Sequence, residues 1–260
     1  MKEHLMELWQ YKNLIWLFVQ RDLQARYKQT FLGVGWAVIQ PLFLMLVFSL
    51  IFDKFLKVDS SGIPYPIFSY AALLPWLFIS RSMNVAATSL IGFKALVTKV
   101  YFPREIVPLS IMVSSLVDFA IGSLVFFIML LHFKVDVGGW GLFLVFLVPM
   151  MILLAGALAL IVSTLTAIFR DLQFAMPLFV QLWMYASPVI YGLQGIQKTY
   201  LPLFYLNPAA GIIDSFRRVI LLNQAPNWGL LASSGIWAVG LFVFGYWLFK
   251  KLEGFVIDIL

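Results

Sequence analysis

Two ionisable side chains lie inside long apolar stretches of this chain, where any chemistry or conformational switching within the protein interior would have to occur. Arg81 falls within the stretch 67–90 and Asp118 within the stretch 106–131. An ionised group in such surroundings is costly unless it is paired with an opposite charge or reaches water. Two interpretations follow. Either these residues form a mutual or interfacial salt bridge, or they take part in a substrate path or a conformational switch.

The motifs of soluble enzymes are missing. The sequence contains no G-x-x-x-x-G-K-[ST] phosphate loop and no G-x-G-x-x-G dinucleotide motif. His4 and His132 cannot form a zinc site by themselves, and no cysteine is present. An intramembrane enzyme would have to draw its acids and bases from Asp118 and few other groups, and an ion-coupled carrier needs more ionisable positions inside its spans. We therefore predict no enzyme activity, metal or cofactor in this chain, and an energy source in another chain if it transports.

The composition points to a membrane protein. Of 260 residues, 62% are hydrophobic and only 12% are charged, against about 25% charged in an average soluble chain. The mean hydropathy is +0.95, so the chain has too few charges to cover a surface in water, and a lipid bilayer is the fitting solvent. The 18 basic residues, which give a net charge of +6, are scattered and form no continuous basic face. We expect no nucleic-acid partner.

Six stretches are long and apolar enough to cross a bilayer, which requires about 20 residues in a helix. They are 34–52, 67–90, 106–131, 142–169, 172–191 and 229–249. These runs are too long, and alternate too little, for the strands of a membrane barrel. The sequence therefore predicts an all-α membrane protein with six transmembrane helices.

The basic residues predict the orientation. Eleven lie in the N-terminal arm, the second-to-third and fourth-to-fifth connections and the tail, whereas six lie in the opposite loops. Because positively charged loops stay in the cytoplasm, both termini are expected there.

Residues 16–31 have the pattern of an amphipathic helix lying in the cytoplasmic interface. Trp16, Val19, Leu23, Tyr27 and Phe31 share one face at helical spacing, while Asp22 and the basic residues fall elsewhere. The alternative is a soluble arm that merely precedes the first span. We divide the chain into an interface region, 1–32, and a six-span domain, 33–260.

The last outer loop carries a second helix signature. Asn207 is expected as the N-cap and Pro208 as the first helical residue, and Asp214 is spaced to pair with Arg217 and Arg218 along the helix. A shorter helix near 194–204, stopped by Pro202, is expected before it. Two such re-entrant elements would suit a gate, and an inert cap is the alternative.

Aromatic residues make up 17% of the chain, and many lie in the middle of the spans. Most are expected to be lipid contacts or interfacial belts. A minority lining a water-filled path would suit stacking against the apolar faces of sugar rings.

Several short blocks, in order along nearly the whole chain, resemble polysaccharide-exporting ABC transporter permeases, the family that includes permeases for lipid-linked O antigen, capsule and teichoic acid. The blocks are Arg21-Asp22-Leu23 with Arg26-Tyr27-Lys28-Gln29-Thr30, Leu32-Gly33, Trp36 and Pro41; Pro75-Trp76; Lys99 to Glu105; Arg170-Asp171; Ser187 to Tyr191; Asn207-Pro208; and Glu253.

The resemblance implies a type II ABC exporter permease fold in the bacterial inner membrane, a homodimer, and two copies of a separate cytoplasmic ATPase that binds ATP and Mg²⁺. It implies that a coupling helix near 92–103 docks on the ATPase, with Lys94, Lys99, Phe102, Arg104 and Glu105 as the candidate residues. The family commonly has an asparagine and a further basic residue near Ala95 and Thr98, and this chain departs from that pattern.

The resemblance also implies a path for an undecaprenyl-pyrophosphate-linked glycan, lined by the first and fifth spans. The candidate sugar contacts are Trp36, Phe43, Phe179, Trp183 and Tyr185; the candidate access site for the lipid pyrophosphate is Arg26, Lys28, Leu32 and Gly33; and the candidate outer gate is Asn207, Pro208, Asp214, Arg217 and Arg218. Two cations at a helix end suit a dianion, and attraction to anionic lipid is the equal alternative for Arg26 and Lys28. The rival functions are a small-lipid or drug exporter and a membrane-embedded glycolipid enzyme or scaffold.

Overall fold

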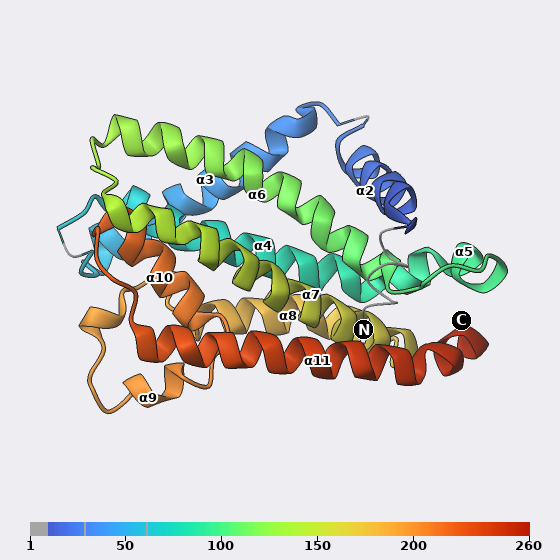
Figure 1. Ribbon diagram of the computed structural model, residues 1–260. Coiled ribbons are helices and arrows are strands. Elements are labelled where there is room, and N and C mark those ends of the chain that lie inside the picture. Colours follow the sequence, from blue (N-terminus) through green and yellow to red (C-terminus); the bar gives the residue numbers. More distant parts are fainter. Residues whose placement is uncertain (1–9, 29, 61) are drawn as a thin grey trace.

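The computed structural model describes residues 10–28, 30–60 and 62–260, and the regular structure of these residues is helical throughout (Figure 1). The first nine residues of the expected interface region, with His4 among them, and Gln29 lie outside the described residues. The longer helices, in chain order, are α2 Lys12–Tyr27, α3 Trp36–Phe48, α4 Tyr65–Gly92, α6 Ile106–His132, α7 Leu144–Ile168, α8 Leu172–Tyr185, α10 Ala210–Leu221 and α11 Trp228–Ile259. The short elements are η1 Gly33–Gly35, the π-helical η2 Ser49–Phe55, α5 Lys94–Lys99, η3 Gly139–Phe143, η4 Leu193–Gly195 and α9 Leu201–Phe204.

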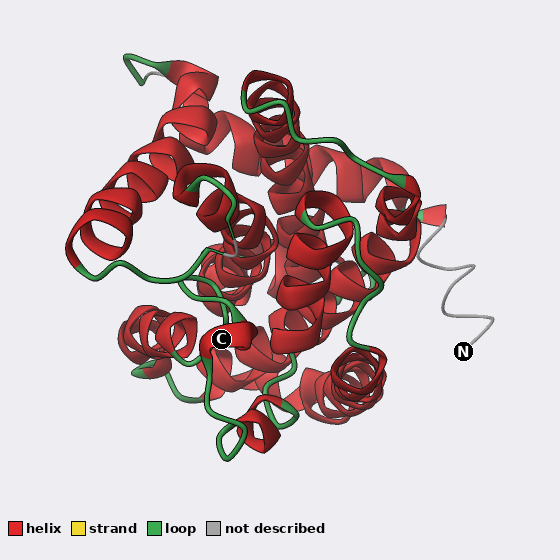
Figure 2. Cartoon of the chain, turned by 90° about the vertical axis from the view of Figure 1, so that its left-hand side faces the viewer, coloured by secondary structure: helices red, strands yellow, loops and turns green. Residues whose placement is uncertain are grey.

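Helix α4 forms the middle of the bundle and packs against α3, α6, α7, α8 and α10. Most of its side chains are buried, and Figure 2 shows the other helices ranged around the interior when the bundle is turned by 90°. Its serines bond to their own helix, as when Ser82 Oγ donates to the carbonyl of Phe78 at 2.8 Å. Local bonds of this kind allow a comparatively polar helix to be buried.

Helix α11 lies along α7, and small residues permit the close approach. A Cβ atom on Gly245 would lie 2.9 Å from the carbonyl oxygen of Ala157 on α7. A similar contact fixes α10 to α11, because a Cβ on Gly211 would lie 2.4 Å from the carbonyl oxygen of Leu230. Small residues let helix backbones meet where neither water nor a large side chain separates them.

Four helical stretches of the described residues are long and apolar enough to cross a membrane. They are Gly33–Phe55, Ile106–His132, Gly139–Ile168 and Trp228–Ile259. Helix α4, with 28 residues, would measure about 42 Å and has the length but a more polar composition. Helix α8, with 14 residues, would measure about 21 Å, less than the roughly 30 Å of a hydrocarbon core.

The fifth predicted span, 172–191, is therefore helical only as far as Tyr185. The chain turns through residues 186–190, and the Ser187-Pro188 pair lies within that turn. Proline disfavours helical geometry at the residue before it, which explains the early end.

The helix expected over 16–31 is present as α2, but its buried face differs from the predicted one. Phe18 and Val19 are buried, whereas Trp16 is 54% exposed and Phe31 lies beyond the helix end. The ring of Phe18 packs edge-on against Phe93 and Phe102, at centroid distances of 4.9 and 5.9 Å. Helix α2 lies beside α6 (Figure 1), so contact with the bundle decides which face is turned inward.

The outer loop also differs in detail from the prediction. Helix α10 begins at Ala210, and the expected N-cap Asn207 lies three residues earlier. The side chain of Asn207 nevertheless accepts a hydrogen bond from the backbone N–H of Ala209 at 3.1 Å. Pro202 opens the short helix α9 and does not stop it, because a proline ring is compatible with the first turn.

Candidate functional site

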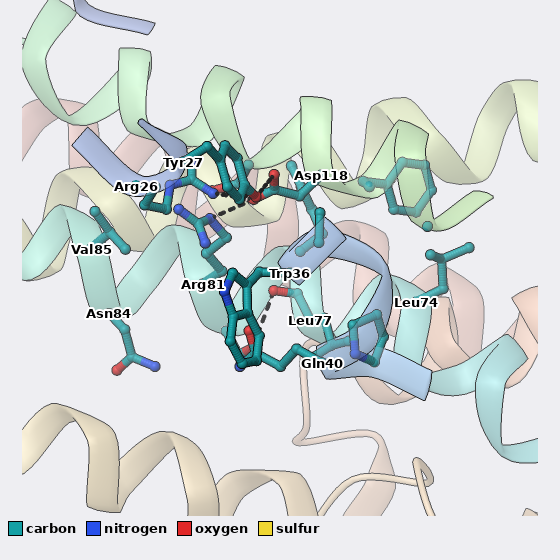
Figure 3. Close-up of a pocket in the computed structure, with 17 residues that line it drawn as sticks. Arg26, Tyr27, Trp36, Gln40, Leu74, Leu77, Arg81, Asn84, Val85 and Asp118 are labelled. Atoms are coloured by element: carbon teal, nitrogen blue, oxygen red, sulfur yellow. Dashed lines mark hydrogen bonds and ion pairs between the residues drawn. The ribbon is translucent and has the colours of Figure 1, made fainter. Parts of the chain in front are cut away.

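Four charged side chains and a tyrosine meet where α2 lies against α4 and α6, and we call them the ion cluster: Asp22, Arg26, Tyr27, Arg81 and Asp118. Figure 3 shows the last four. Asp118 on α6 is the centre of the ion cluster. One carboxylate oxygen, Oδ2, lies 2.5 Å from Arg26 Nη1 and 2.9 Å from Arg81 Nε. The other, Oδ1, accepts a hydrogen bond of 2.7 Å from the hydroxyl of Tyr27.

Asp22 joins the ion cluster from within α2. Its carboxylate lies 2.6 Å from Arg26 Nη2, one helical turn later, and accepts a hydrogen bond from Ser114 on α6. Arg26 Nη2 also donates to Ser114 Oγ at 3.0 Å. The sequence placed Asp22 away from the apolar face of the interface helix, and in the structure its carboxylate is turned toward α6.

The ion cluster is formally neutral, since two guanidinium groups balance two carboxylates. The pairing alternative for Arg81 and Asp118 is therefore present in the structure. Burial, with the hydrogen bond to Asp118 as the next cause, raises the pKa of Tyr27 to about 12. The phenol stays protonated at neutral pH and acts as a donor to the carboxylate.

A cavity of about 390 Å³ adjoins the ion cluster. Its walls come from α2, α3, α4 and α6, and Arg26, Tyr27, Arg81 and Asp118 form its charged end. Trp36 and Gln40 face it from α3 (Figure 3). A cavity that combines an aromatic ring, amides and two guanidinium groups can hold an anionic polar ligand.

Arg81 is incompletely satisfied in this setting. Its Nε and Nη2 are both buried and make no hydrogen bond of acceptable geometry, although Asp118 and Asp22 lie 2.9 and 3.8 Å away. The nearby carboxylates thus balance the charge of Arg81, although its Nε and Nη2 donate no hydrogen bond to them. Asn84 Oδ1, which lies on the wall of the same cavity, is also buried without a hydrogen-bond partner.

The residues predicted to contact the pyrophosphate lie in different surroundings. Arg26 is turned into the ion cluster, whereas Lys28 is exposed just beyond the end of α2. Leu32 and Gly33 lie in the connection to α3, and Gly33 has a φ of +52°, a conformation that glycine adopts without strain. This connection joins α2 directly to the helix that carries Trp36.

The predicted sugar contacts fall into two groups. Trp36 lines the cavity, and Phe43, on the same helix, is exposed. On α8, the rings of Phe179 and Trp183 are 6.1 Å apart, and Trp183 packs edge-on against Trp76 at 5.3 Å. Phe179 is 54% exposed and Tyr185 is also exposed, so the α8 aromatics border an open face of the single chain.

The predicted coupling residues divide into a protruding and a buried set. Lys94 and Lys99 are exposed on α5, which projects at the end of the bundle where the chain terminates (Figure 1). Phe102 and Glu105 are buried just after it. Glu105 forms an ion pair of 2.8 Å with Lys250 on α11.

The remaining predicted coupling residue, Arg104, strengthens the same attachment. Its guanidinium lies 3.5 Å from Glu253, which is itself 3.3 Å from Lys250. These charges tie the segment between α5 and α6 to the C-terminal part of α11. In the sequence, Glu253 was noted only as part of the family resemblance, and its ion pairs with Arg104 and Lys250 were not predicted.

At the opposite end of the bundle, Asn207 links α8 to α10. Its Oδ1 accepts from Trp183 Nε1 at 3.0 Å, and its Nδ2 donates to Ser187 Oγ at 2.9 Å and to the carbonyl of Ala186 at 3.1 Å. Pro208 follows in the turn before α10 and is half-buried. A predicted path residue and a predicted gate residue are thus in direct contact.

Arg217 has a role that the sequence did not suggest. It is 2% exposed and donates to four backbone carbonyls: Phe68, Pro188, Val189 and Tyr191, at 3.3, 3.1, 2.8 and 2.9 Å. Its guanidinium also lies 3.8 Å from the ring centre of Phe68. Arg217 therefore fastens α10 to the start of α4 and to the turn after α8.

The ion pairs expected between Asp214 and the two arginines Arg217 and Arg218 do not form. Among the ion pairs between described residues, none joins these side chains. Arg218 instead donates to the carbonyl of Ala225 at 2.9 Å, and Asp214 is buried. Carbonyls left free by the turn at 186–190 compete successfully for the guanidinium of Arg217.

No group of three or more metal-ligating side chains is found among the described residues.

Comparison with known proteins gives a consistent result. The family model described as "ABC-2 type transporter" matches residues 13–221. The chain is 32% identical over 227 residues to the O-antigen export system permease protein RfbA of Myxococcus xanthus, a match that covers 85% of each chain. It is 27% identical over 244 residues to RfbA of Klebsiella pneumoniae, covering 93% of this chain and 92% of the relative.

A more distant match is the polysialic acid transport protein KpsM of Escherichia coli, at 21% identity over 77% of this chain and 78% of the relative. The apolar helices and the family match together make this a multi-pass membrane protein. Helices α3 to α10, and all of α2 except Lys12, lie within the matched region. The chain therefore belongs to the ABC-2 type transporter family.

Proposed function

We propose that this chain is the permease subunit of an ABC transporter that exports a polysaccharide of the O-antigen type across the bacterial inner membrane. The observation that carries the proposal is the 32% identity to an O-antigen export permease over 85% of both chains. Such extensive coverage leaves little of the molecule for an unrelated function. The intramembrane cavity, with its polar and aromatic walls, supports a polar substrate carried on a lipid.

The energy comes from ATP bound, with Mg²⁺, by a separate cytoplasmic ATPase, of which two copies serve two permeases. The absence of a phosphate loop from the sequence fits a subunit without its own nucleotide site. Helix α5 is suited to be the docking element because Lys94 and Lys99 are exposed on it. Arg104 and Glu105, through Glu253 and Lys250, transmit its movement to α11.

The permease works as a homodimer with six spans in each copy. Four of these spans are the apolar stretches named above, and α4 and α8 are the other two. The exposed apolar side chains of α3 and α8 support this arrangement; they include Phe43, Leu46, Leu178, Phe179 and Leu182. A second copy would cover them, and it would also surround the short helix α8 with protein. Both termini face the cytoplasm, in accord with the excess of basic residues at that end.

An undecaprenyl-pyrophosphate-linked glycan enters beside the connection formed by Leu32 and Gly33, with Arg26 and Lys28 near its phosphates. The sugars then pass along Trp36, Phe43, Phe179, Trp183 and Tyr185. Asn207, Pro208, Asp214, Arg217 and Arg218 belong to the outer gate. The contact between Trp183 and Asn207 supports a direct connection between path and gate.

The proposal is tested in a bacterium that lacks its own O-antigen permease and expresses this chain with its ATPase. We expect surface polysaccharide to be restored, and expect the purified pair to hydrolyse ATP faster when lipid-linked glycan is added. A permease that copurifies with no ATPase, or that modifies a glycolipid without one, would contradict the proposal and favour a membrane-embedded enzyme.

A further inference from the structure

Arg81 has the geometry of a ligand-binding cation more than that of a completed salt bridge. Its Nε lies 2.9 Å from Asp118 Oδ2, yet neither Nε nor Nη2 makes a hydrogen bond, and both atoms are buried. Arginine presents five N–H donors in a rigid fork. A guanidinium with unused donors is stabilised when an oxyanion accepts hydrogen bonds from it.

Part of the Arg81 side chain reaches the cavity, because that side chain is 24% exposed. Arg81 lies on its wall, below Asp118 and beside Trp36 (Figure 3). Asn84, one turn further along α4, also faces it with a buried Oδ1 that accepts no hydrogen bond. An acceptor of this kind suits a hydroxyl group, such as a sugar would supply.

Asp118 explains why Arg81 can remain charged there. The carboxylate neutralises Arg81 from one side, while Arg26 and Tyr27 supply its own hydrogen bonds. Asp118 therefore does not depend on Arg81 for its hydrogen bonds, and Arg81 is free to use its donors elsewhere. The formal charge of the ion cluster is zero without a ligand. R81Q makes it negative by one unit, and D118N makes it positive by one unit.

We propose that Arg81 is the oxyanion-binding residue of this cavity, that the oxyanion is a phosphate group attached to a lipid, and that Asp118 is the counter-ion that keeps Arg81 charged there. The assignment of that phosphate to the transported substrate rests on the proposed function, whereas the site itself does not. Arg26, which both carboxylates engage, is then a structural member of the ion cluster and not the main contact for the phosphate.

The test uses the full chain in phosphatidylcholine nanodiscs and farnesyl pyrophosphate as the probe, with binding measured by calorimetry. We expect R81Q to raise the Kd about tenfold or more. D118N, which leaves the ion cluster with an additional positive charge, is expected to bind at least as tightly as the wild type. R170Q removes an exposed cation outside the cavity and is expected to leave the Kd unchanged.

A role in folding alone predicts a different pattern. If R81Q and D118N weaken binding equally, or if R81Q binds like the wild type, the inference is overturned. The double variant R81Q/D118N restores neutrality and guards against misfolding; it is expected to elute as the wild type does and still to bind weakly. Tight binding by a well-folded double variant would also overturn the inference.

Two controls identify the source of the phosphate. Farnesol, which has no phosphate, is expected not to bind, and equal binding of farnesol would overturn the oxyanion assignment. If phosphatidylglycerol in the nanodisc competes with farnesyl pyrophosphate, the site is supported and its occupant is a bulk phospholipid. If it does not compete, the site is supported and its occupant is the prenyl pyrophosphate.

The export assay separates this inference from the proposed function. A wild-type chain that binds the probe but restores no surface polysaccharide would refute the proposed function and leave the site intact. A chain that restores polysaccharide, but whose R81Q variant binds the probe normally, would refute the site and leave the proposed function intact.

Discussion

Tyr27, at the end of α2, donates a hydrogen bond of 2.7 Å to Asp118, in the middle of α6 and 91 residues further along the chain. The bond connects an N-terminal helix to a side chain inside a predicted span. It also lies at the edge of the cavity that Trp36 and Arg81 line. Helix α2 is therefore part of the cavity wall and not only an element of the membrane surface.

Removing this hydroxyl is expected to weaken the attachment of α2. Tyr27→Phe leaves the partly buried Asp118 Oδ1 without that donor, and the loss of one such hydrogen bond costs about 1 kcal/mol. We predict a lower midpoint of thermal unfolding for the purified protein, together with faster proteolysis near residues 28–33. Tyr101→Phe, at a residue that is 79% exposed, is the matched control and should change neither measurement.

Arg217 is predicted to be much more important for stability than its neighbour Arg218. Arg217→Met strips hydrogen bonds from four carbonyls at once, and we expect a loss of about 3 kcal/mol or more. Arg218→Met removes one bond, to Ala225, and should cost about 1 kcal/mol. Thermal unfolding monitored by intrinsic fluorescence distinguishes the two. Equal midpoints for the two variants would refute the assigned role of Arg217.

Exposed lysines on α5 are predicted to guide docking of the ATPase. The double variant Lys94→Glu/Lys99→Glu reverses two charges without touching a buried group, and we expect the amount of ATPase recovered with the permease to fall about tenfold, since charge reversal at an interface repels the partner. Lys198→Glu changes an exposed residue in the segment just before α9, a helix that lies far from α5 (Figure 1), and should leave recovery unchanged. Normal recovery with the double variant would exclude α5 lysines from docking.

The aromatic path predicts a kinetic defect without a defect in assembly. Replacing Trp36, Phe179 and Tyr185 by alanine removes three ring contacts, each worth about 0.5–1.5 kcal/mol, and export should slow roughly tenfold. Dimer formation, followed by crosslinking, should persist. The rate is measured as polysaccharide appearing at the cell surface after induction.

A matched set of exposed rings provides the control for that experiment. Phe127, Phe146 and Phe244 are exposed on α6, α7 and α11, away from the proposed path. Their replacement by alanine should leave export unchanged. An equal decline in both sets would indicate a general effect of lost apolar surface and would argue against a path.

The sequence determined the helical elements and much of the chemical class. Apolar stretches at the required length located α3, α4, α6, α7 and α11, because helix periodicity and hydropathy are local properties of the chain. The lack of a phosphate loop and the scarcity of ionisable groups inside the spans predicted an energy source in another chain. The end of α8 was misplaced by six residues, because hydropathy alone does not register the turn before Pro188.

Only the tertiary structure decided which polar groups meet. Asp22 and Arg26 are one turn apart on α2, where side chains can pair locally, but their contacts with Ser114 and Asp118 depend on how α2 is rotated against α6. Three of the four carbonyls that Arg217 contacts, those of Pro188, Val189 and Tyr191, lie where the chain turns after α8. Such contacts depend on how helices far apart in the chain are rotated against one another, and on backbone groups whose availability no side-chain pattern records.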